Sequence, residues 1–273
     1  MSTWDKLLQE AKPRGHLVQL YKSDEYLLTK NVSDYIRDGL NRGDGLLVIA
    51  TGEHSQEFAR RLQGEGTDME AAVSDGRLVA LDAHEALEQS MVSGRLDWGR
   101  FDRAIGSLVR QVAGRPDRTG LRAYSEMVGV LWNAGHYSAA IRLERFWNKL
   151  LASHAFNLFC AYPIDVFGKE FRIAALDALL RAHTHLLPSG TNGNLETAIN
   201  RAMDEVLGPR VGDLRLLIKA NYRPSWAVLP KAEAIVLWLR NNLPEDADQI
   251  LSRAFQYYRP LHPPAAAFAK QQG

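Results

Sequence analysis

The fold is decided by two stretches of the chain, Arg122-Ala-Tyr-Ser-Glu-Met-Val-Gly-Val-Leu-Trp132 and Leu158-Phe-Cys-Ala-Tyr-Pro163. Each stretch is predicted to start as a short buried strand that ends at polar residues and is followed by a helix. In a parallel α/β sheet, this carboxyl end of a strand is where ligands bind. Glu126 follows directly after its run, and a carboxylate there must be solvated, paired or used. The two stretches therefore predict a parallel sheet with Glu126 at its ligand-binding edge.

Working outward from these stretches, five strands alternate with helical patterns along the first two thirds of the chain. The predicted strands cover 16–21, 46–50, 77–82, 120–125 and 155–162. Leu46-Leu-Val-Ile-Ala50 is apolar throughout, which is typical of a strand covered on both faces. Strands that alternate with helices predict a three-layer α/β fold with a mostly parallel five-stranded sheet and right-handed crossovers.

The pattern changes at Leu187-Pro-Ser-Gly-Thr-Asn-Gly-Asn194, after which only helical periodicity remains. We predict an N-terminal helix over 1–14, the α/β domain over 15–188, a linker over 189–194, an all-helical appendage over 195–259 and a flexible tail over 260–273. The appendage has more large apolar residues than a small bundle can bury. They are Trp226, Val228, Leu229, Ile235, Val236, Leu237, Trp238 and Leu239. We expect some of them to pack on the α/β domain or on a second copy, in a homodimer.

Composition narrows the class of protein. The 273 residues have a formal net charge of +1 and include one cysteine, Cys160. Balanced charge without a basic run gives no indication of a nucleic-acid or membrane surface. The sequence shows no signal-peptide core and no apolar run of membrane-spanning length. A single cysteine fits a reducing compartment, so we expect a cytoplasmic protein.

An α/β sheet invites a nucleotide-binding interpretation, but its motifs are missing from the sequence. There is no Gly-x-x-x-x-Gly-Lys-Ser/Thr loop, and Gly168-Lys-Glu170, which comes closest, lacks the first glycine and the hydroxyl. There is also no Gly-x-Gly-x-x-Gly loop and no Gly-x-Ser-x-Gly elbow. We therefore expect neither nucleotide turnover nor a cofactor.

The candidate ligand-binding residues all lie at or just past predicted strand ends. They are Tyr21, Glu53, His54, Asp82, His84, Glu126 and Tyr162. In this hypothesis Glu126 is a hydrogen-bond acceptor or anion, His84 is its titratable partner and the tyrosines form walls with a polar tip.

Other arrangements of the same residue types remain open. Asp82, His84 and Glu126 could form a metal or acid/base set, although Asp82 could equally cap the next helix and leave His84 solvated. Cys160 could pair with His154 or His16 as a nucleophile, but a cysteine within an apolar strand usually behaves as a small hydrophobe. His183-Thr-His185 stands at a predicted helix end, where a dipole partner is favoured over a ligand pair. No metal site is predicted.

Several segments resemble the MEDS domain, the methanogen/methylotroph sensory domain of DcmR-type regulators. The resemblance rests on His16-Leu-Val-Gln-Leu-Tyr-Lys-Ser-Asp24, Leu81-Asp-Ala-His-Glu-Ala-Leu87 with Met91-Val-Ser-Gly-Arg95, Ala182-His-Thr-His-Leu-Leu-Pro188 and the two opening stretches. It implies a RecA/KaiC-like fold without a phosphate loop, in a prokaryotic signal-transduction input domain that senses simple hydrocarbon derivatives. Family members are often fused to kinase or DNA-binding outputs, which this sequence does not show.

Three hypotheses for function follow. The leading one is a cytoplasmic sensory or regulatory module that binds a small ligand at the carboxyl edge of the sheet and signals by protein–protein contact, to a partner such as a kinase or transcription regulator. The second is an enzyme that uses Asp82, His84 and Glu126. The third is a ligand-free interaction scaffold.

Overall fold

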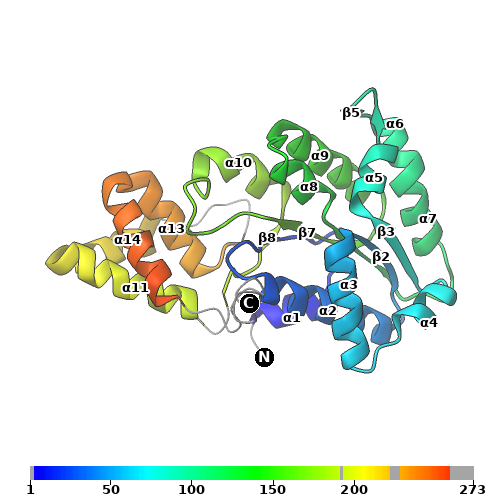
Figure 1. The fold of residues 1–273 in the computed structure, drawn as a ribbon, viewed down its shortest axis with the longest axis horizontal. Coiled ribbons are helices and arrows are strands. Elements are labelled where there is room, and N and C mark those ends of the chain that lie inside the picture. The colour runs from blue at the N-terminus through cyan, green and yellow to red at the C-terminus, as the bar shows by residue number, and fades with distance from the viewer. Residues whose placement is uncertain (1–2, 191–192, 222–227, 259–273) are drawn as a thin grey trace, which may run out of the picture. The chain divides into compact units, whose positions relative to one another are not determined.

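The structure is a computed structural model that describes residues 3–190, 193–221 and 228–258 (Figure 1). The chain divides into two compact units. The first comprises Met1–Val18, Leu28–Pro163 and Ala182–Thr184, and the second comprises Gln19–Leu27, Ile164–Arg181 and His185–Gly273. No described helix is both long enough and apolar enough to cross a bilayer.

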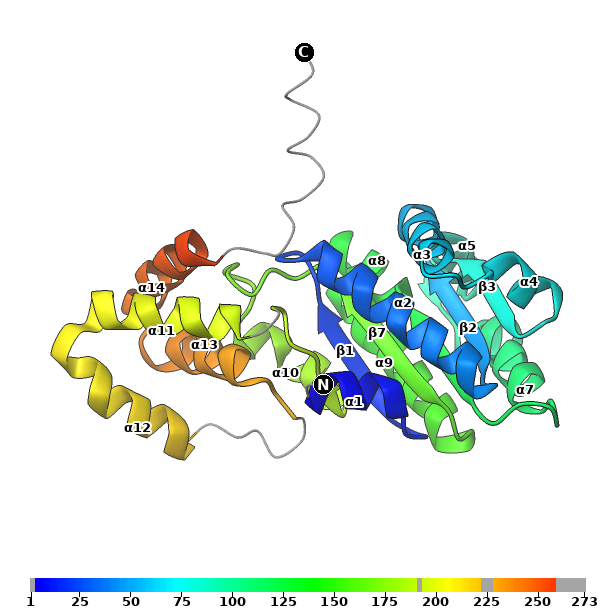
Figure 2. The ribbon, with the colours of Figure 1, turned by 90° about the horizontal axis from the view of Figure 1, so that it is seen from below.

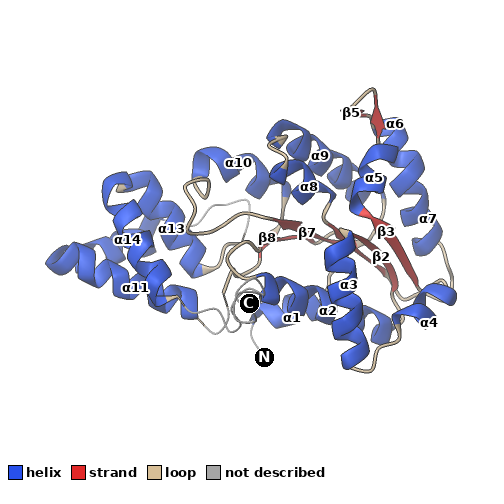
Figure 3. Cartoon of the chain, in the orientation of Figure 1, coloured by secondary structure: helices blue, strands red, loops and turns tan. Residues whose placement is uncertain are grey.

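A six-stranded, mostly parallel sheet is the centre of the fold (Figure 3), which confirms the predicted α/β class. Its strand order is β3-β2-β6-β7-β1-β8, and β2 pairs in parallel with both β3 and β6, as β6 does with β7. The strands are β1 His16–Leu20, β2 Gly45–Ala50, β3 Leu78–Asp82, β6 Leu121–Ser125, β7 Asn157–Tyr162 and β8 His185–Leu186. β1, β2, β6 and β7 are buried along their whole length, as expected for strands covered on both faces.

Helices cover both faces of this sheet, with α1 and α2 on one face and α8 and α9 on the other (Figure 1). On the α2 face, Tyr35 packs edge-on against Phe159 of β7 and donates a hydrogen bond to Asn157. On the α9 face, Trp147 is fully buried. The helices of this part are α1 Thr3–Glu10, α2 Glu25–Arg42, α3 Gly52–Gly64, α4 Met69–Ser74, α5 Ala83–Gln89, α6 Trp98–Phe101, α7 Ser107–Ala113, α8 Met127–Asn133 and α9 Tyr137–Ser153.

The connection from β6 to α8 brings the helix very close to β7. A Cβ atom at Gly129 would lie 2.6 Å from the carbonyl oxygen of Ala161, so α8 approaches β7 backbone to backbone. Only glycine permits this approach, and it fixes the path of the chain just after Glu126.

The short elements differ from the sequence prediction. The sheet has six strands rather than five, because His185 and Leu186 form β8 immediately after helix α10. A strand of two residues is too short to show an alternation of apolar and polar residues. The sequence pattern predicts a helix over Ala83–Met91 and a break at Gly94, whereas the structure has a two-stranded hairpin there, β4 Met91–Val92 with β5 Arg95–Leu96. The apolar spacing over Phe101–Val112 predicts one helix, but Asp102–Gly106 forms a π-helical turn ahead of α7.

The second unit is mainly helical (Figure 2). Its helices are α10 Ile173–Ala182, which ends one residue inside the first unit, α11 Asn194–Leu207, α12 Val211–Asn221, α13 Lys231–Asn242 and α14 Pro244–Tyr257, with a 3₁₀ turn at Gly208–Arg210. Segments assigned to the α/β domain in the sequence also belong to this unit. Arg240 of α13 donates to the carbonyl oxygen of Phe167, and Tyr258 donates to Asp24.

The apolar residues predicted to exceed the capacity of a small bundle are largely buried in this unit. Ile235, Val236, Leu237, Trp238 and Leu239 of α13 are all buried. The rings of Phe167 and Phe255 pack edge-on at 5.4 Å, so the segment after β7 contacts α14. Val228 is half exposed, and Trp226 lies outside the described residues.

Candidate functional site

Glu126 lies just past the carboxyl end of β6, and its side chain is only 3% exposed. Three donors surround its carboxylate: the Tyr124 hydroxyl at 2.6 Å, His54 Nδ1 at 2.7 Å and the backbone N–H of Thr51 at 2.8 Å. Since a carboxylate can only accept, His54 carries its proton on Nδ1. The buried charge is thus held by charge-assisted hydrogen bonds rather than left bare.

The local sequence explains this convergence. β2 and β6 are neighbours in parallel, so the turn from β2 into α3 meets the end of β6 at one edge of the sheet. Thr51 precedes α3, and His54 lies in its first turn. Phe58, one helical turn further, stacks on His54 and packs edge-on against Tyr124. A polar pair thus stands beside an aromatic wall, and the His54 side chain is 16% exposed.

The remaining predicted residues are placed differently. Asp82 ends β3 and caps α5, because its carboxylate accepts from the backbone N–H groups of His84 and Glu85. This is the capping alternative considered from the sequence, and the His84 side chain is exposed. Glu53 is exposed in the first turn of α3, and Tyr21 belongs to the second unit. Of the seven predicted residues, Glu126 and His54 share a hydrogen bond.

Tyr162 is buried, and its hydroxyl donates to Glu144 of α9 at 2.6 Å rather than to Glu126. Glu144 belongs to a second polar cluster, which the sequence did not predict. The cluster comprises His16, Glu144, Cys160 and His183, and their ligand atoms all lie within 4.8 Å of one another. In the described part of the chain this is the group that could hold a metal ion, and the Asp82, His84 and Glu126 set is not such a group. We call it the His₂-Glu-Cys cluster.

The protonation of the His₂-Glu-Cys cluster follows from its burial and its contacts. Burial favours the neutral acid, but the contacts with His183 and His16 overcome this and lower the pKa of Glu144 below its usual range. Burial, followed by the neighbouring His183, lowers the pKa of His16. Burial and the Glu144 charge raise the pKa of Cys160, so its thiol stays protonated when no cation is near.

Two signals in the sequence could have found this cluster. Glu144 interrupts the apolar stripe of α9 between Leu143 and Trp147, and both of these neighbours are buried. A carboxylate on the buried face of a helix requires partners. The second signal is His183, for which the sequence favours a role as a partner of a helix end. It is instead fully buried against Glu144, because the chain turns from α10 into the sheet at this point.

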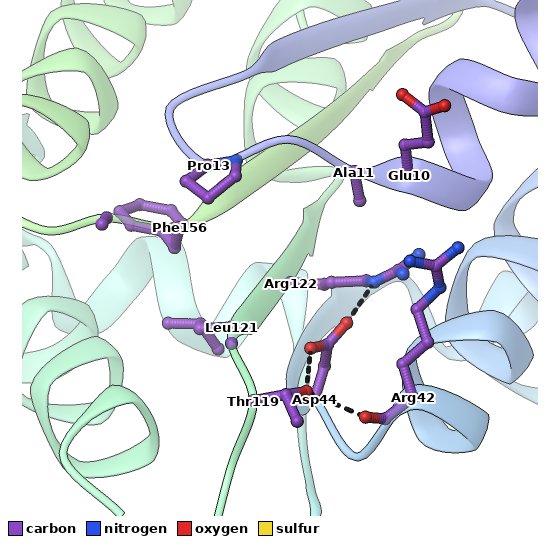
Figure 4. A pocket seen from close by; sticks show the side chains of 11 residues that line it. Glu10, Ala11, Pro13, Arg42, Asp44, Thr119, Leu121, Arg122 and Phe156 are labelled. Carbon is purple, nitrogen blue, oxygen red and sulfur yellow. Dashed lines mark hydrogen bonds and ion pairs between the residues drawn. The ribbon is translucent and has the colours of Figure 1, made fainter.

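A hollow of about 400 Å³ opens at the opposite, amino edge of the sheet (Figure 4). Asp44 lines it and accepts from Arg122 Nε at 2.7 Å and from the Thr119 hydroxyl at 2.7 Å. Arg122 is 2% exposed and also donates to the backbone carbonyls of Leu8 and Gln9, so its guanidinium ties α1 to β6. None of the seven predicted site residues lines this hollow.

Comparison with known proteins agrees with the resemblance found in the sequence. No curated protein matches the chain. The family model described as MEDS, the methanogen/methylotroph, DcmR sensory domain, matches residues 15–184. This span covers more than half of the 273 residues and includes the sheet strands β1, β2, β3, β6 and β7, Glu126 and the whole His₂-Glu-Cys cluster. The chain therefore belongs to the MEDS family of sensory domains.

Proposed function

We propose that the chain is a sensory module that binds a small, weakly polar molecule at the carboxyl edge of its sheet, beside Glu126 and His54. The observation that carries the proposal is the Glu126–His54 pair itself, a buried carboxylate bonded to a partly exposed imidazole at adjoining strand ends. Membership of a sensory family supports the general role, and the pair supports the place.

The surroundings of the pair suit a small ligand of mixed character. Phe58 and Tyr124 supply aromatic surface, and the His54 imidazole beside them has a side chain that is 16% exposed. Because the Tyr124, Thr51 and His54 donors fix Glu126, the imidazole is held in one orientation. A short alcohol, amine or halogenated methane could place its carbon on the rings and its heteroatom on His54.

Chemical-shift mapping tests the place of binding. The isotopically labelled full chain is titrated with methanol, methylamine and dichloromethane as separate probes. We expect shifts for the amides of Thr51, His54 and Glu126. Shifts confined to Asp44 and Arg122 would move the site to the hollow at the amino edge. No shifts with any probe would favour the ligand-free scaffold.

Side-chain variants sharpen the same test. Glu126→Gln removes the charge that orients His54, and we expect at least a tenfold weaker affinity for the probe that binds, equivalent to about 1.4 kcal/mol. Glu70→Gln is the matched control, because Glu70 is an exposed carboxylate of α4. Equal affinities for the two variants would contradict a role for Glu126.

Signalling through protein–protein contact, in a cytoplasmic setting and through a homodimer, completes the proposal. Its support in the second unit is exposed apolar surface, with Leu216 of α12 at 69% and Phe255 of α14 at 61% exposure. Light scattering of the full chain should give a dimer mass, and Leu216→Glu should shift it toward the monomer. A monomeric wild-type chain at working concentration would overturn the dimer.

A further inference from the structure

The His₂-Glu-Cys cluster is built by four separate parts of the first unit. His16 begins β1, Cys160 lies in β7, Glu144 lies in α9 and His183 belongs to the short segment Ala182–Thr184. His16, Glu144, Cys160 and His183 have side chains that are 2% exposed or less. Two imidazoles, a carboxylate and a thiol that are buried to this extent need hydrogen-bond partners for their polar atoms and a partner for any charge.

The contacts between these groups have the dimensions of a coordination shell. His16 Nε2 lies 3.4 Å from Cys160 Sγ and 3.3 Å from Glu144 Oε2, and His183 Nε2 lies 3.2 Å from Glu144 Oε1. Ligand atoms around tetrahedral zinc, with Zn–N and Zn–S bonds of about 2.1 and 2.3 Å, are separated by about 3.4 to 3.8 Å. The cluster is therefore close to the size that one ion needs.

Asn148 fixes which nitrogen of His16 faces the cluster. Its amide nitrogen donates to the carbonyl oxygen of Ala182 at 2.9 Å, which leaves the amide oxygen 3.0 Å from His16 Nδ1. Nδ1 must then carry the proton, and the lone pair on Nε2 points at Cys160 and Glu144. Histidines that bind metal ions are oriented in this way, through a carbonyl oxygen on the other ring nitrogen.

Glu144 Oε2 accepts no hydrogen bond from the described residues, although it is completely buried. It lies 3.3 Å from the Nε2 lone pair of His16. Two acceptors at this distance repel each other unless a proton or a cation lies between them. A divalent cation would also make the cluster neutral. Its two positive charges are balanced by one thiolate and one carboxylate, and both imidazoles stay uncharged.

We propose that His16, Glu144, Cys160 and His183 bind one Zn²⁺ ion in a closed tetrahedral site. Two nitrogens, one sulfur and one oxygen form a set that zinc accepts, and four protein ligands leave no position open for a substrate. The role is therefore structural: the ion fastens the segment Ala182–Thr184 to α9, β1 and β7. It enters while the chain folds, since the ligands have no solvent-exposed face. The site is independent of ligand binding beside Glu126.

Metal content and spectroscopy of the full chain, without a histidine tag, test this inference. After refolding with zinc and dialysis, elemental analysis should give about one zinc per chain. Cobalt substitution should produce a thiolate-to-cobalt charge-transfer band in the near ultraviolet, together with the intense visible bands of a tetrahedral ion. Neither measurement depends on a variant that might fail to fold.

Matched variants then assign the ligands. His183→Gln should lower zinc affinity at least tenfold in competition with a chelator, and His136→Gln, at an exposed histidine ahead of α9, should leave it unchanged. Cys160→Ser should abolish the charge-transfer band. Asn148→Ala should keep the band but weaken affinity by about 10- to 100-fold, as expected for a positioning residue.

The outcomes that would overturn the site are equally specific. A wild-type chain that folds in chelator and takes up no zinc on refolding would show that a proton, rather than a cation, lies between His16 and Glu144. Zinc that remains bound with equal affinity in His183→Gln and His136→Gln would place the ion elsewhere. A cobalt spectrum without a thiolate band would exclude Cys160 as a ligand.

Discussion

Glu126 and Glu144 are two buried carboxylates that face opposite sides of the same sheet. Glu126 points toward α3, whereas Glu144 reaches from α9 to Tyr162 on the other face. Each accepts from a buried tyrosine at 2.6 Å and each has a histidine beside it. The difference lies in access, because His54 is partly exposed while His16 and His183 are not. Solvent therefore reaches the carboxylate–histidine group on one face of the sheet and is kept from the group on the other.

The largest expected difference is in stability. Glu144→Ala leaves His16, His183 and the Tyr162 hydroxyl without their shared partner in a site that water cannot enter, so we expect a loss of about 3 to 5 kcal/mol. Glu126→Ala should cost about 1 to 3 kcal/mol, because water can reach the groups around His54. Urea unfolding in the presence of a chelator, followed by circular dichroism, measures both. Equal losses of unfolding free energy in the two variants would contradict the difference in solvent access between the two sites.

Removing the hydroxyl of Tyr162 or of Tyr124 should have a smaller effect on stability and tests the same difference between the two sites. Tyr162→Phe removes one donor from the closed cluster and should destabilise the chain by about 2 kcal/mol, as for a hydrogen bond to a charged group. Tyr124→Phe leaves Glu126 with Thr51 and His54, and should cost about 1 kcal/mol. A thermal-unfolding series on the two variants gives the order, and a larger loss for Tyr124→Phe would reverse our ranking of the two sites.

Glu233 is a third buried carboxylate, and it lies in the second unit. It accepts from the backbone N–H of Ser189, and burial raises its pKa above the usual value. A raised pKa means that the folded chain holds the proton more tightly than the unfolded chain. This contribution to stability is therefore complete below the unfolded pKa and is lost as pH rises through the folded pKa.

Glu233→Gln keeps the acceptor and removes the charge. We expect it to stabilise the chain by about 1 kcal/mol at neutral pH and to change little in acid. Unfolding free energies of both chains across the acid-to-neutral range check this. A variant that is less stable than the wild type at neutral pH would point to an ionised Glu233 with a cationic partner.

The smallest effect should come from Asp82→Asn, because the Asp82 carboxylate acts as the cap of α5. Asp82→Ala should cost about 1 kcal/mol, and Asp82→Asn almost nothing, since asparagine caps a helix as well as aspartate does. Ligand affinity should be the same in both. If Asp82→Asn reduced affinity as much as Glu126→Gln, Asp82 would belong to the binding site as well.

The sequence was sufficient for the layers of the fold and for the place of Glu126. The hydrophobic periodicity and the lengths of the apolar runs predicted β1, β2, β3, β6 and β7. Glu126, the polar residue after β6, predicted the carboxyl end of that strand. β8 could not be predicted, since two residues have no period. Its presence depends on a pairing that only the folded chain creates.

The candidate site was predicted less completely, for a physical reason. Glu126 and His54 follow neighbouring strands, so topology alone brings them together. His16 and His183 are far apart along the chain, yet their rings lie 4.0 Å apart because β1 and the segment after α10 meet. Contacts of this kind between distant segments depend on strand order, which the sequence pattern left open.

The guanidinium of Arg122 has a practical consequence for where this protein can be cut. The family match starts at residue 15, but two of the carbonyl oxygens that Arg122 contacts belong to Leu8 and Gln9. A shortened chain that begins at the family boundary would leave a buried cation short of acceptors and open the floor of the amino-edge hollow to water. The cooperative folding unit thus extends into α1, and a protease that clips this helix should loosen the sheet from its amino end.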